Sequence, residues 1–275
     1  MPIAACVQLN GSSDVERNLR VTQQLVRQAA AAGATLVATP EATTYLGPHD
    51  RKARLAEPLD GPTHQRLGAL ARELGITLVV GSVAERWEPP AGREPDRAYN
   101  TTLVFGPDGR RLASYRKVHL FDVDLREAGG VTFRESATTA RGTEPVVVAT
   151  PAGRLGLSIC FDLRFPEHFR ALTDRGAEVL LVPAAFTLMT GMDHWHTLLR
   201  ARAIETQSWV LAPAQWGAHD DDGLRRSYGH SLIVDPWGTV VAECGDGEGI
   251  CLAEVDLDRV ADVRRRIPMN ANRQL

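Results

Sequence analysis

The sequence is poor in cysteine, and its four cysteines show no pairing that would indicate a disulfide framework or a zinc site. They are Cys6, Cys160, Cys244 and Cys251. They are widely spaced and form no C-x-x-C pair, a pattern typical of a reduced, cytoplasmic protein. The eight histidines do not cluster with them. His194 and His196 stand two residues apart, but we expect them on a helix and interpret them as packing or surface residues. We expect no metal site.

Long apolar runs and long basic runs are also missing. No apolar stretch approaches the length that crosses a bilayer, and the N-terminal segment 1–8 lacks the basic region of a signal peptide. The formal net charge of -3 gives no reason to expect a polyanionic partner. The short cluster Arg264–Arg266 is interpreted as a solvated helix face or turn. We therefore expect neither a membrane nor a nucleic acid as a partner.

No linker-like segment divides the chain, so we expect one domain over residues 1–275. Alternating apolar residues predict about a dozen strands, among them 2–9, 76–83, 154–159 and 178–183. Helical patterns lie between them, at 14–32, 62–74, 166–175 and 194–206. Loops are predicted at 88–98 and 123–142. Each half of the chain offers strands and two helices, enough for a sheet covered on one face. Two such halves pack sheet on sheet, which predicts an α/β fold with α-β-β-α layers.

One stretch, 154–167, combines a strand, a cysteine and the start of a helix. Its first half alternates apolar residues up to Cys160, and Pro166 suits the first position of a helix, where its missing N–H is not needed. A cysteine at such a turn is exposed near the positive end of a helix, which lowers the pKa of its thiol and suits it to nucleophilic attack. From this stretch alone, an equally good interpretation is that Cys160 is a small buried hydrophobic residue.

Two further polar residues stand where predicted strands end. Glu41 follows the apolar strand 35–39, and Lys117 follows the strand 112–116. Sites form beyond the strand ends of open sheets, so these two side chains and Cys160 can converge. Taken singly, Glu41 is an exposed or capping acid and Lys117 a solvated charge. Together they are chemically complete: the carboxylate accepts the thiol proton, the thiolate attacks, and the ammonium stabilises the oxyanion.

These residues lie in segments that resemble the three signature segments of the nitrilase superfamily of carbon–nitrogen hydrolases. The segments are Pro40–Ala42, Tyr115–Asp122 and Ile159–Glu167. The resemblance continues in order through 183–186, 190–191, 194–195, 198–205, 228–231 and 235–242, which covers nearly the whole chain. It is strongest to the Nit amidase branch, and within it to the deaminated glutathione amidases. It implies an α-β-β-α sandwich, no cofactor, and a homodimer paired through the helix after the nucleophile and the helix that holds 201–205.

The resemblance also implies a role for each matching residue. Cys160 is the nucleophile, Glu41 the general base, and Lys117 stabilises the tetrahedral intermediate. Glu135 matches the family's second active-site glutamate, which positions Lys117 and the substrate amide; by itself it would be a solvated loop acid. Phe161 contributes its backbone N–H to the oxyanion hole.

The implied partner is a small-molecule amide, an acid whose terminal carboxamide is hydrolysed to a carboxylate and ammonia. Deaminated glutathione is the leading substrate, and 2-oxoglutaramate or 2-oxosuccinamate, the substrates of ω-amidases, are the close alternative. The further alternatives are a hydrolase of a different amide or of a nitrile, and last a non-catalytic scaffold. Arg164 is a candidate to bind the substrate carboxylate, although an ion pair with Asp162 or Glu167 is an equally good interpretation. The other candidates to contact the substrate are Tyr45, Phe161, Phe186 and Thr187.

Overall fold

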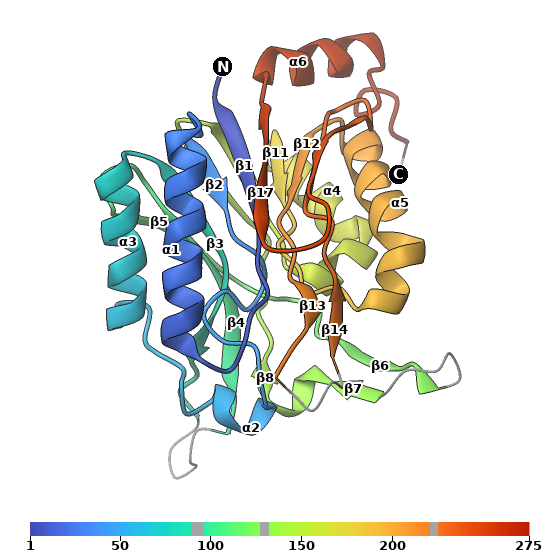
Figure 1. The fold of residues 1–275 in the computed structure, drawn as a ribbon. Coiled ribbons are helices and arrows are strands. Elements are labelled where there is room, and N and C mark those ends of the chain that lie inside the picture. The colour runs from blue at the N-terminus through green and yellow to red at the C-terminus, as the bar shows by residue number, and fades with distance from the viewer. Residues whose placement is uncertain (90–95, 127–131, 221–224, 275) are drawn as a thin grey trace.

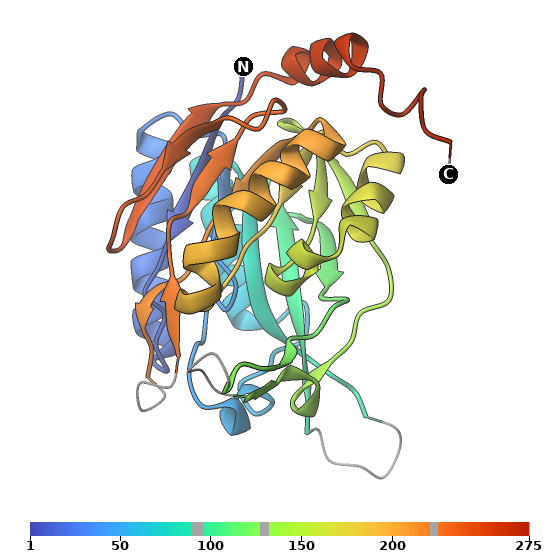
Figure 2. The same cartoon turned by 90° about the vertical axis from the view of Figure 1, so that its right-hand side faces the viewer.

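The computed structural model describes residues 1–89, 96–126, 132–220 and 225–274. Two β-sheets pack face to face, and helices cover the outer face of each sheet, which gives four layers in the order α-β-β-α (Figures 1 and 2). This arrangement confirms the predicted sandwich. None of the described helices is long and apolar enough to cross a membrane.

The first sheet contains strands from both ends of the chain. In order across the sheet they are β17 (Gly249–Glu254), β1 (Ile3–Gln8), β2 (Leu36–Ala38), β3 (Thr77–Arg86), β4 (Ala98–Phe105) and β5 (Arg111–Arg116), with β8 (Thr139–Ala140) beside β4. β1, β2 and β3 run parallel. The outer face is covered by α1 (Val15–Ala31) and α3 (Pro62–Leu74) (Figure 1). Because β17 pairs with β1, the expectation that each half of the chain builds its own sheet is incomplete.

The second sheet carries the strand that precedes Cys160. Its order is β16 (Val240–Glu243), β15 (Leu232–Val234), β12 (Trp209–Ala212), β11 (Val179–Leu181), β10 (Gly153–Leu157) and β9 (Val146–Thr150). β10, β11 and β12 run parallel. Its outer face is covered by α4 (Pro166–Asp174) and α5 (Leu188–Thr206) (Figure 2). A last helix, α6 (Leu257–Arg266), follows β17 at the upper end of Figure 1.

Alternate side chains of strand β1 belong to two different hydrophobic clusters. Ala4 and Cys6 of β1 belong to the hydrophobic cluster that includes the second sheet, whereas Ala5 and Val7 belong to the cluster beneath α1 and α3. Successive side chains of a strand point to opposite faces, so an all-apolar strand can be buried on both sides. The first sheet is therefore a middle layer of the molecule.

Three segments differ from their predictions. Helix α5 begins at Leu188, six residues before the predicted start at 194. The predicted loop 123–142 contains β7 (Thr132–Arg134), which pairs with β6 (Asp122–Asp124), then the 3-10 helix η2 (Glu135–Ala137) and β8. The hairpin of β13 (Trp216–Ala218) and β14 (Arg226–Tyr228) had no predicted counterpart. Residues 127–131, and residues 90–95 of the predicted loop 88–98, lie outside the described residues.

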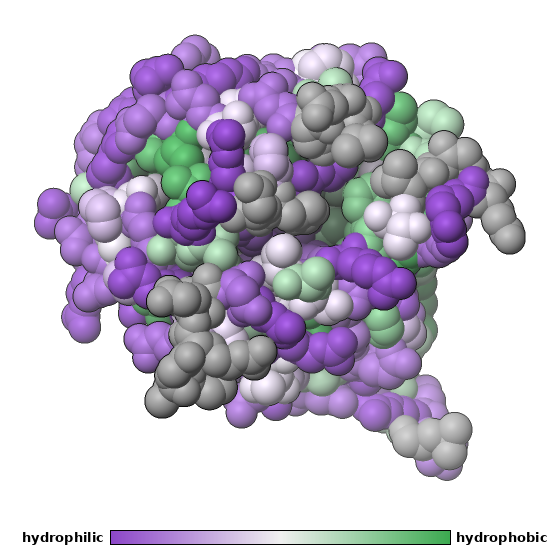
Figure 3. Space-filling model, turned by 90° about the horizontal axis from the view of Figure 1, so that it is seen from below, coloured by the Kyte–Doolittle hydropathy of each residue, from purple (hydrophilic) through white to green (hydrophobic). Residues whose placement is uncertain are grey.

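The carboxyl ends of the parallel strands lie at the lower end of the sandwich in Figure 1. The short helix α2 (His49–Lys52) and the hairpins β6–β7 and β13–β14 surround this end. Seen from below, its described surface is mostly hydrophilic, with apolar side chains between the polar ones (Figure 3). In sheets with parallel strands, ligands bind beyond the carboxyl ends, so this is where a site is expected.

Candidate active site

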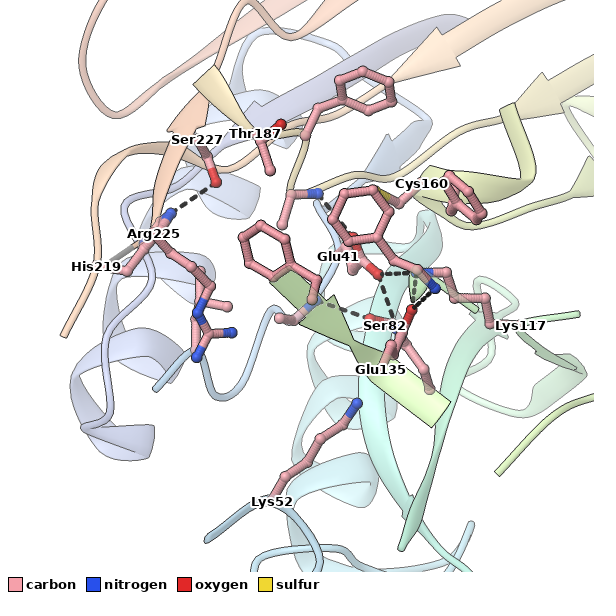
Figure 4. Close-up of a pocket in the computed structure, with 18 of the residues that line it drawn as sticks. Glu41, Lys52, Ser82, Lys117, Glu135, Cys160, Thr187, His219, Arg225 and Ser227 are labelled. Atoms are coloured by element: carbon pink, nitrogen blue, oxygen red, sulfur yellow. Dashed lines mark hydrogen bonds and ion pairs between the residues drawn. The ribbon is translucent and has the colours of Figure 1, made fainter. Parts of the chain in front are cut away.

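Four side chains singled out from the sequence meet at the lower end of the sandwich. Glu41 follows β2, Lys117 follows β5, Cys160 follows β10, and Glu135 begins η2. All four line one pocket (Figure 4). The pocket therefore draws its polar groups from strand ends of both sheets.

The ammonium of Lys117 lies between two carboxylates. Its Nζ donates to Glu41 Oε1 and to Glu135 Oε2, both at 2.9 Å, and its side chain is 2% exposed. Asn100 of β4 donates to the same two carboxylates, at 2.8 Å to Glu41 and 3.2 Å to Glu135. Burial lowers the pKa of the Lys117 ammonium, but the charges of Glu135 and Glu41 outweigh burial and hold the pKa well above its usual value. The ammonium stays charged in a buried place.

The second sheet holds the Glu41 carboxylate from the other side. Glu41 Oε2 accepts a hydrogen bond from the N–H of Ala185, beyond the end of β11, at 2.9 Å. The backbone carbonyl of Glu41 accepts from Nε2 of Gln215, beyond the end of β12, at 2.8 Å. The carboxylate of one sheet is thus oriented by donors of the other.

Close packing beside the segment that leads into Glu41 requires a glycine at position 81 of β3. A Cβ on Gly81 would lie 1.8 Å from the Thr39 carbonyl oxygen and 2.4 Å from Pro183 Cβ. The Gly81 N–H donates to Thr39 Oγ1 at 3.1 Å, and the register of β3 against β4 shifts between Val80 and Val83. This glycine and the irregular register bring the end of β2 against β3 and close to the second sheet.

Cys160 opens a short 3-10 helix, η3 (Cys160–Arg164), and α4 starts only at Pro166. Its φ is 48°, in the left-handed region that residues other than glycine rarely adopt. Its N–H donates to the Pro183 carbonyl oxygen at 2.9 Å. The turn places the Cys160 thiol at the pocket, on the same side as Glu41 and Lys117 (Figure 4).

The thiol pKa differs from its sequence prediction. Burial, and then the negative charge of Glu41, raise the pKa of the Cys160 thiol well above its usual value, and Lys117 opposes them only in part. The expectation of a lowered pKa is wrong, because Cys160 is buried, stands beside a carboxylate and opens a 3-10 turn rather than the first turn of an α-helix. The resting thiol is neutral and shares its pocket with a carboxylate, Glu41, that can accept its proton.

A fully buried carboxylate, Asp162, braces the turn that carries Cys160. Asp162 Oδ2 accepts from the Tyr115 hydroxyl at 2.7 Å and from the Ile159 N–H at 2.8 Å. Asp162 Oδ1 accepts from the His119 N–H at 3.0 Å and lies 2.7 Å from His119 Nδ1. Both oxygens of the Asp162 carboxylate are therefore bonded to these partners. Asp162 does not form the ion pair with Arg164 that the sequence allowed as an alternative.

The five residues predicted to contact the substrate line the same pocket. They are Tyr45, Phe161, Arg164, Phe186 and Thr187. The guanidinium carbon of Arg164 lies 5.0 Å from the centre of the Phe186 ring, and its Nη1 lies 3.3 Å from His194 Nδ1. The Tyr45 hydroxyl donates to the Pro48 carbonyl oxygen at 2.8 Å, which fixes its ring against the wall.

Sequence reasoning missed Asn100, Lys52 and the end of the β13–β14 hairpin. Lys52 ends α2 and points toward the pocket, as do Arg225 and Ser227 from the hairpin (Figure 4). One available signal was the scarcity of lysine: the chain has two among 275 residues, Lys52 and Lys117, and both line the pocket. The other basic side chains of the chain are arginine and histidine, so the position of each lysine could have been singled out as a candidate site residue.

Cations surround the pocket beyond the Glu41–Lys117–Cys160 cluster. They are Lys52, Arg134, Arg164, Arg225 and Arg226. Lys52 Nζ donates to Thr139 Oγ1 at 3.1 Å. Burial lowers the pKa of the Lys52 ammonium, and the charge of Glu135 opposes this only in part. A ligand carboxylate near Lys52 would stabilise the charged form of its ammonium.

Glu135 makes stability depend on pH in the acid range. Burial raises the pKa of its carboxyl, but the charges of Lys117 and Lys52 and hydrogen bonds from Lys117 and the Phe121 N–H lower it from 4.5 to about 2. A lowered folded-state pKa gives stability that is present above pH 4.5 and is lost as pH falls toward 2. We expect the free energy of unfolding to lose about 3 kcal/mol over this window through Glu135.

Urea unfolding of the wild type and of Glu135→Gln, at several pH values between about 6 and about 3, measures this contribution. The difference in unfolding free energy between the two proteins should shrink as pH falls. A difference that stays constant across the window would contradict the lowered pKa of Glu135.

Comparison with known proteins identifies the family. The family model for carbon–nitrogen hydrolases matches residues 3–265. The chain belongs to the carbon–nitrogen hydrolase family. It is 42% identical over 279 residues to the deaminated glutathione amidase of Bos taurus, covering 100% of this chain and 82% of that protein. It is 39% identical over 267 residues to the omega-amidase of Homo sapiens, covering 96% and 92%. The predicted membership of the nitrilase superfamily is confirmed: the chain is an amidase, a hydrolase of carbon–nitrogen bonds other than peptide bonds.

Solved structures of relatives share the fold. The NitFhit protein of C. elegans superposes with a TM-score of 0.90 at 40% identity; the match covers 99% of this chain and 65% of that one. The amidase of Nesterenkonia sp. AN1 superposes with a TM-score of 0.78 at 27% identity, covering 98% of this chain and 100% of that one. In that structure, a glutamate-to-glutamine variant shows the result of Michael addition of acrylamide at the active-site cysteine.

Proposed function

We propose that the chain hydrolyses its amide substrate through a thioester on Cys160, with Glu41 as general base and Lys117 as the group that stabilises the oxyanion. One observation carries the proposal: the Cys160 thiol lines the same pocket as the buried Glu41 carboxylate, which accepts a hydrogen bond from the Lys117 ammonium at 2.9 Å. A nucleophile, its proton acceptor and a fixed positive charge then share one pocket. The reactive cysteine of the Nesterenkonia amidase supports a cysteine nucleophile here.

The cycle starts from the neutral thiol. Glu41 takes the Cys160 proton as the sulfur bonds to the amide carbon, and the carbonyl oxygen becomes an oxyanion that Lys117 and the Phe161 N–H stabilise. Protonated Glu41 gives its proton to the leaving nitrogen as the carbon–nitrogen bond breaks, which leaves a thioester. Glu41 then takes a proton from water, whose oxygen attacks the thioester. When the carbon–sulfur bond breaks, the sulfur regains a proton from Glu41 and the acid product leaves.

Glu135 is a positioning residue in this scheme. Its Oε2 accepts from Lys117 Nζ at 2.9 Å and from the Phe121 N–H at 2.7 Å, while its Oε1 accepts from Asn100 at 3.2 Å. These contacts hold the ammonium at a fixed place before the oxyanion forms, so little reorganisation is needed during the reaction.

The proposed substrate is deaminated glutathione, with 2-oxoglutaramate as the second candidate, because relatives are named for deaminated glutathione and omega-amide hydrolysis. Both compounds carry the same 2-oxo acid acyl group and differ in the leaving group. This corrects one expectation from the sequence: deaminated glutathione has no terminal carboxamide, so its hydrolysis releases a dipeptide rather than ammonia. The cations around the pocket support an acid substrate of either kind.

The test measures 2-oxoglutarate, the acid product common to both substrates, with the purified chain. A kcat/KM for deaminated glutathione about tenfold or more above that for 2-oxoglutaramate supports the leading substrate. The reverse preference assigns the protein to the ω-amidases. No product from either, in a folded and reduced sample, contradicts the substrate proposal. Activity retained by Cys160→Ala contradicts the mechanism instead.

We expect Lys52→Met to raise KM about tenfold to a hundredfold while kcat changes little, because a hydrogen bond to a charged group is lost in ground state and transition state alike. The charges of Glu135, Lys117 and Glu41 act on Lys52, so its ammonium lies near the reacting groups. We therefore propose that Lys52 binds the carboxylate of the substrate's acyl group, close to the reacting amide. Steady-state kinetics with both substrates measures the effect, and the rise in KM should be similar for the two.

Arg51→Met is the matched control, since Arg51 is the exposed neighbour of Lys52 on α2. Its KM should equal that of the wild type. A rise in KM confined to deaminated glutathione would assign Lys52 to the dipeptide part of that substrate and so contradict the placement on the acyl group.

We further propose that the protein is a cytoplasmic homodimer of one domain, residues 1–275. Apolar exposure on the outer face of α5 supports the dimer: Ile204 is 48% exposed, and it lies beside Gly238, next to Trp237, which is 52% exposed. Four free cysteines support a reducing compartment. A family match over 3–265 supports a single domain. Light scattering of the wild type and of Ile204→Lys tests the dimer.

A further inference from the structure

Outside the pocket, two histidines and a glutamate from three distant segments meet at the surface. His196 is on α5, His230 lies between β14 and β15, and Glu243 ends β16. Glu243 Oε1 lies 2.9 Å from His196 Nε2 and 2.8 Å from His230 Nδ1. The three ligand atoms lie within 4.8 Å of one another. Among the described residues, this is the one group of three such side chains close enough to hold a metal ion.

We propose that His196, His230 and Glu243 bind a divalent transition metal ion, and that Zn²⁺ fits them best. Two imidazole nitrogens and one carboxylate oxygen are a ligand set that Zn²⁺ takes, with a water in the fourth position. At bonds of about 2.0–2.2 Å, tetrahedral ligands lie roughly 3.3 Å apart, so each histidine nitrogen needs to move only slightly away from Glu243 Oε1. Mg²⁺ fits poorly, because it prefers six oxygen ligands.

The exposure of the cluster allows an ion to enter. The side chains of His196, His230 and Glu243 are 34%, 28% and 33% exposed. An ion that keeps one water can therefore bind from solvent without opening the fold. His194, two residues before His196, takes no part in the cluster and lies beside Arg164 instead.

The backbone at His230 is a second, independent observation. His230 has φ 54°, in the left-handed region that is unfavourable for a residue other than glycine. Its ring stacks on Tyr228 with ring centres 4.4 Å apart and planes at 25°. The surrounding structure thus holds the His230 backbone in an unfavourable conformation and its ring in a fixed orientation. Such preorganisation suits a side chain that binds a metal ion.

An ion at this cluster would also tie together elements that form the pocket wall. Ser227 of β14 lines the pocket, and the N–H of Tyr228 donates to the Phe186 carbonyl oxygen at 2.9 Å. His230 follows two residues later. Linking it to α5 and β16 restrains this wall and stabilises the folded chain, since the ion binds the native state.

The experiment measures Zn²⁺ and Mg²⁺ binding to the full chain by calorimetry, in a Cys160→Ala background so that the pocket thiol does not compete for zinc. We expect one equivalent of Zn²⁺, no Mg²⁺, and a rise in the melting temperature with Zn²⁺. His230→Ala and Glu243→Gln should lose this equivalent and the rise. Glu254→Gln, an exposed glutamate on β17, is the matched control and should keep both.

Binding of Co²⁺ provides a second measurement with its own readout. Visible absorption bands of the bound ion, without a thiolate charge-transfer band, are expected from nitrogen and oxygen ligands. Zinc binding that is unchanged in His230→Ala and Glu243→Gln would overturn the proposal. So would a chain that takes up no zinc, or a thiolate band in the Co²⁺ spectrum that persists in both variants.

Discussion

Lys117→Met is expected to lower kcat at least about a thousandfold and to reduce the free energy of unfolding by about 3–5 kcal/mol. The Lys117 ammonium is the cation that both Glu41 and Glu135 contact at 2.9 Å. Without it, two buried carboxylates face each other, and one of them must take up a proton to relieve the repulsion. The variant then lacks the charge that stabilises the oxyanion and has a protonated general base in part of its molecules.

Steady-state kinetics and urea unfolding measure the two effects separately. Arg27→Met is the matched control, because Arg27 forms an ion pair with Glu73 at 2.8 Å in which both side chains are about half exposed. Screening by solvent makes such a pair worth about 1 kcal/mol or less, and no change in kcat is expected. A Lys117→Met protein as stable as the control variant would show that the buried charges are not coupled as described.

Cys160→Ala is expected to reduce kcat by about 10⁴-fold or more, because the thioester can no longer form. Its stability should stay within about 1 kcal/mol of the wild type, since the substitution removes one sulfur atom from a pocket wall. Ammonia or 2-oxoglutarate release measures the first effect, and urea unfolding the second.

Cys160→Gly separates the strain of the turn from the chemistry. At φ 48° a side chain costs about 1–2 kcal/mol that glycine does not. Glycine in turn loses about 0.4–1 kcal/mol more through the entropy of the unfolded chain. Cys160→Gly should therefore be at least as stable as Cys160→Ala, the reverse of the order expected inside a helix. A glycine variant less stable than the alanine variant would argue against the left-handed turn.

The four layers and the strand-end positions of Glu41, Lys117 and Cys160 were predictable because they rest on local patterns. Apolar alternation, glycine and proline at element ends, and a polar residue directly after a strand are all readable within a few residues. Such patterns specify which residues leave the carboxyl end of a strand, and the topology then brings them to one edge of the molecule. The family resemblance added the role proposed for each residue.

Other parts of the site depend on contacts that no local pattern encodes. Lys52 reaches the pocket from α2, which has four residues and too few turns for a periodic signal. Asn100 faces Glu41 because β4 pairs with β3 and because the register shifts beside Gly81. The prediction of a lowered thiol pKa was wrong for the same reason. The direction of the shift depends on how deeply Cys160 is buried and then on a carboxylate 119 positions earlier in the chain, Glu41.

The placement of the two lysines determines how this protein reacts with a reagent that acylates amines. Both lysines of the chain line the pocket, so the outer surface offers such a reagent arginines instead of the usual lysines. Two carboxylates hold Lys117 protonated and therefore unreactive, whereas burial lowers the pKa of Lys52 and leaves more of it as a nucleophilic free amine. Apart from the α-amino group, Lys52 is the amine that should be labelled in the folded protein, and a bound acid should shield it. Covalent labelling of a single side chain would then report how much of the pocket is filled, even for acids that the protein does not hydrolyse.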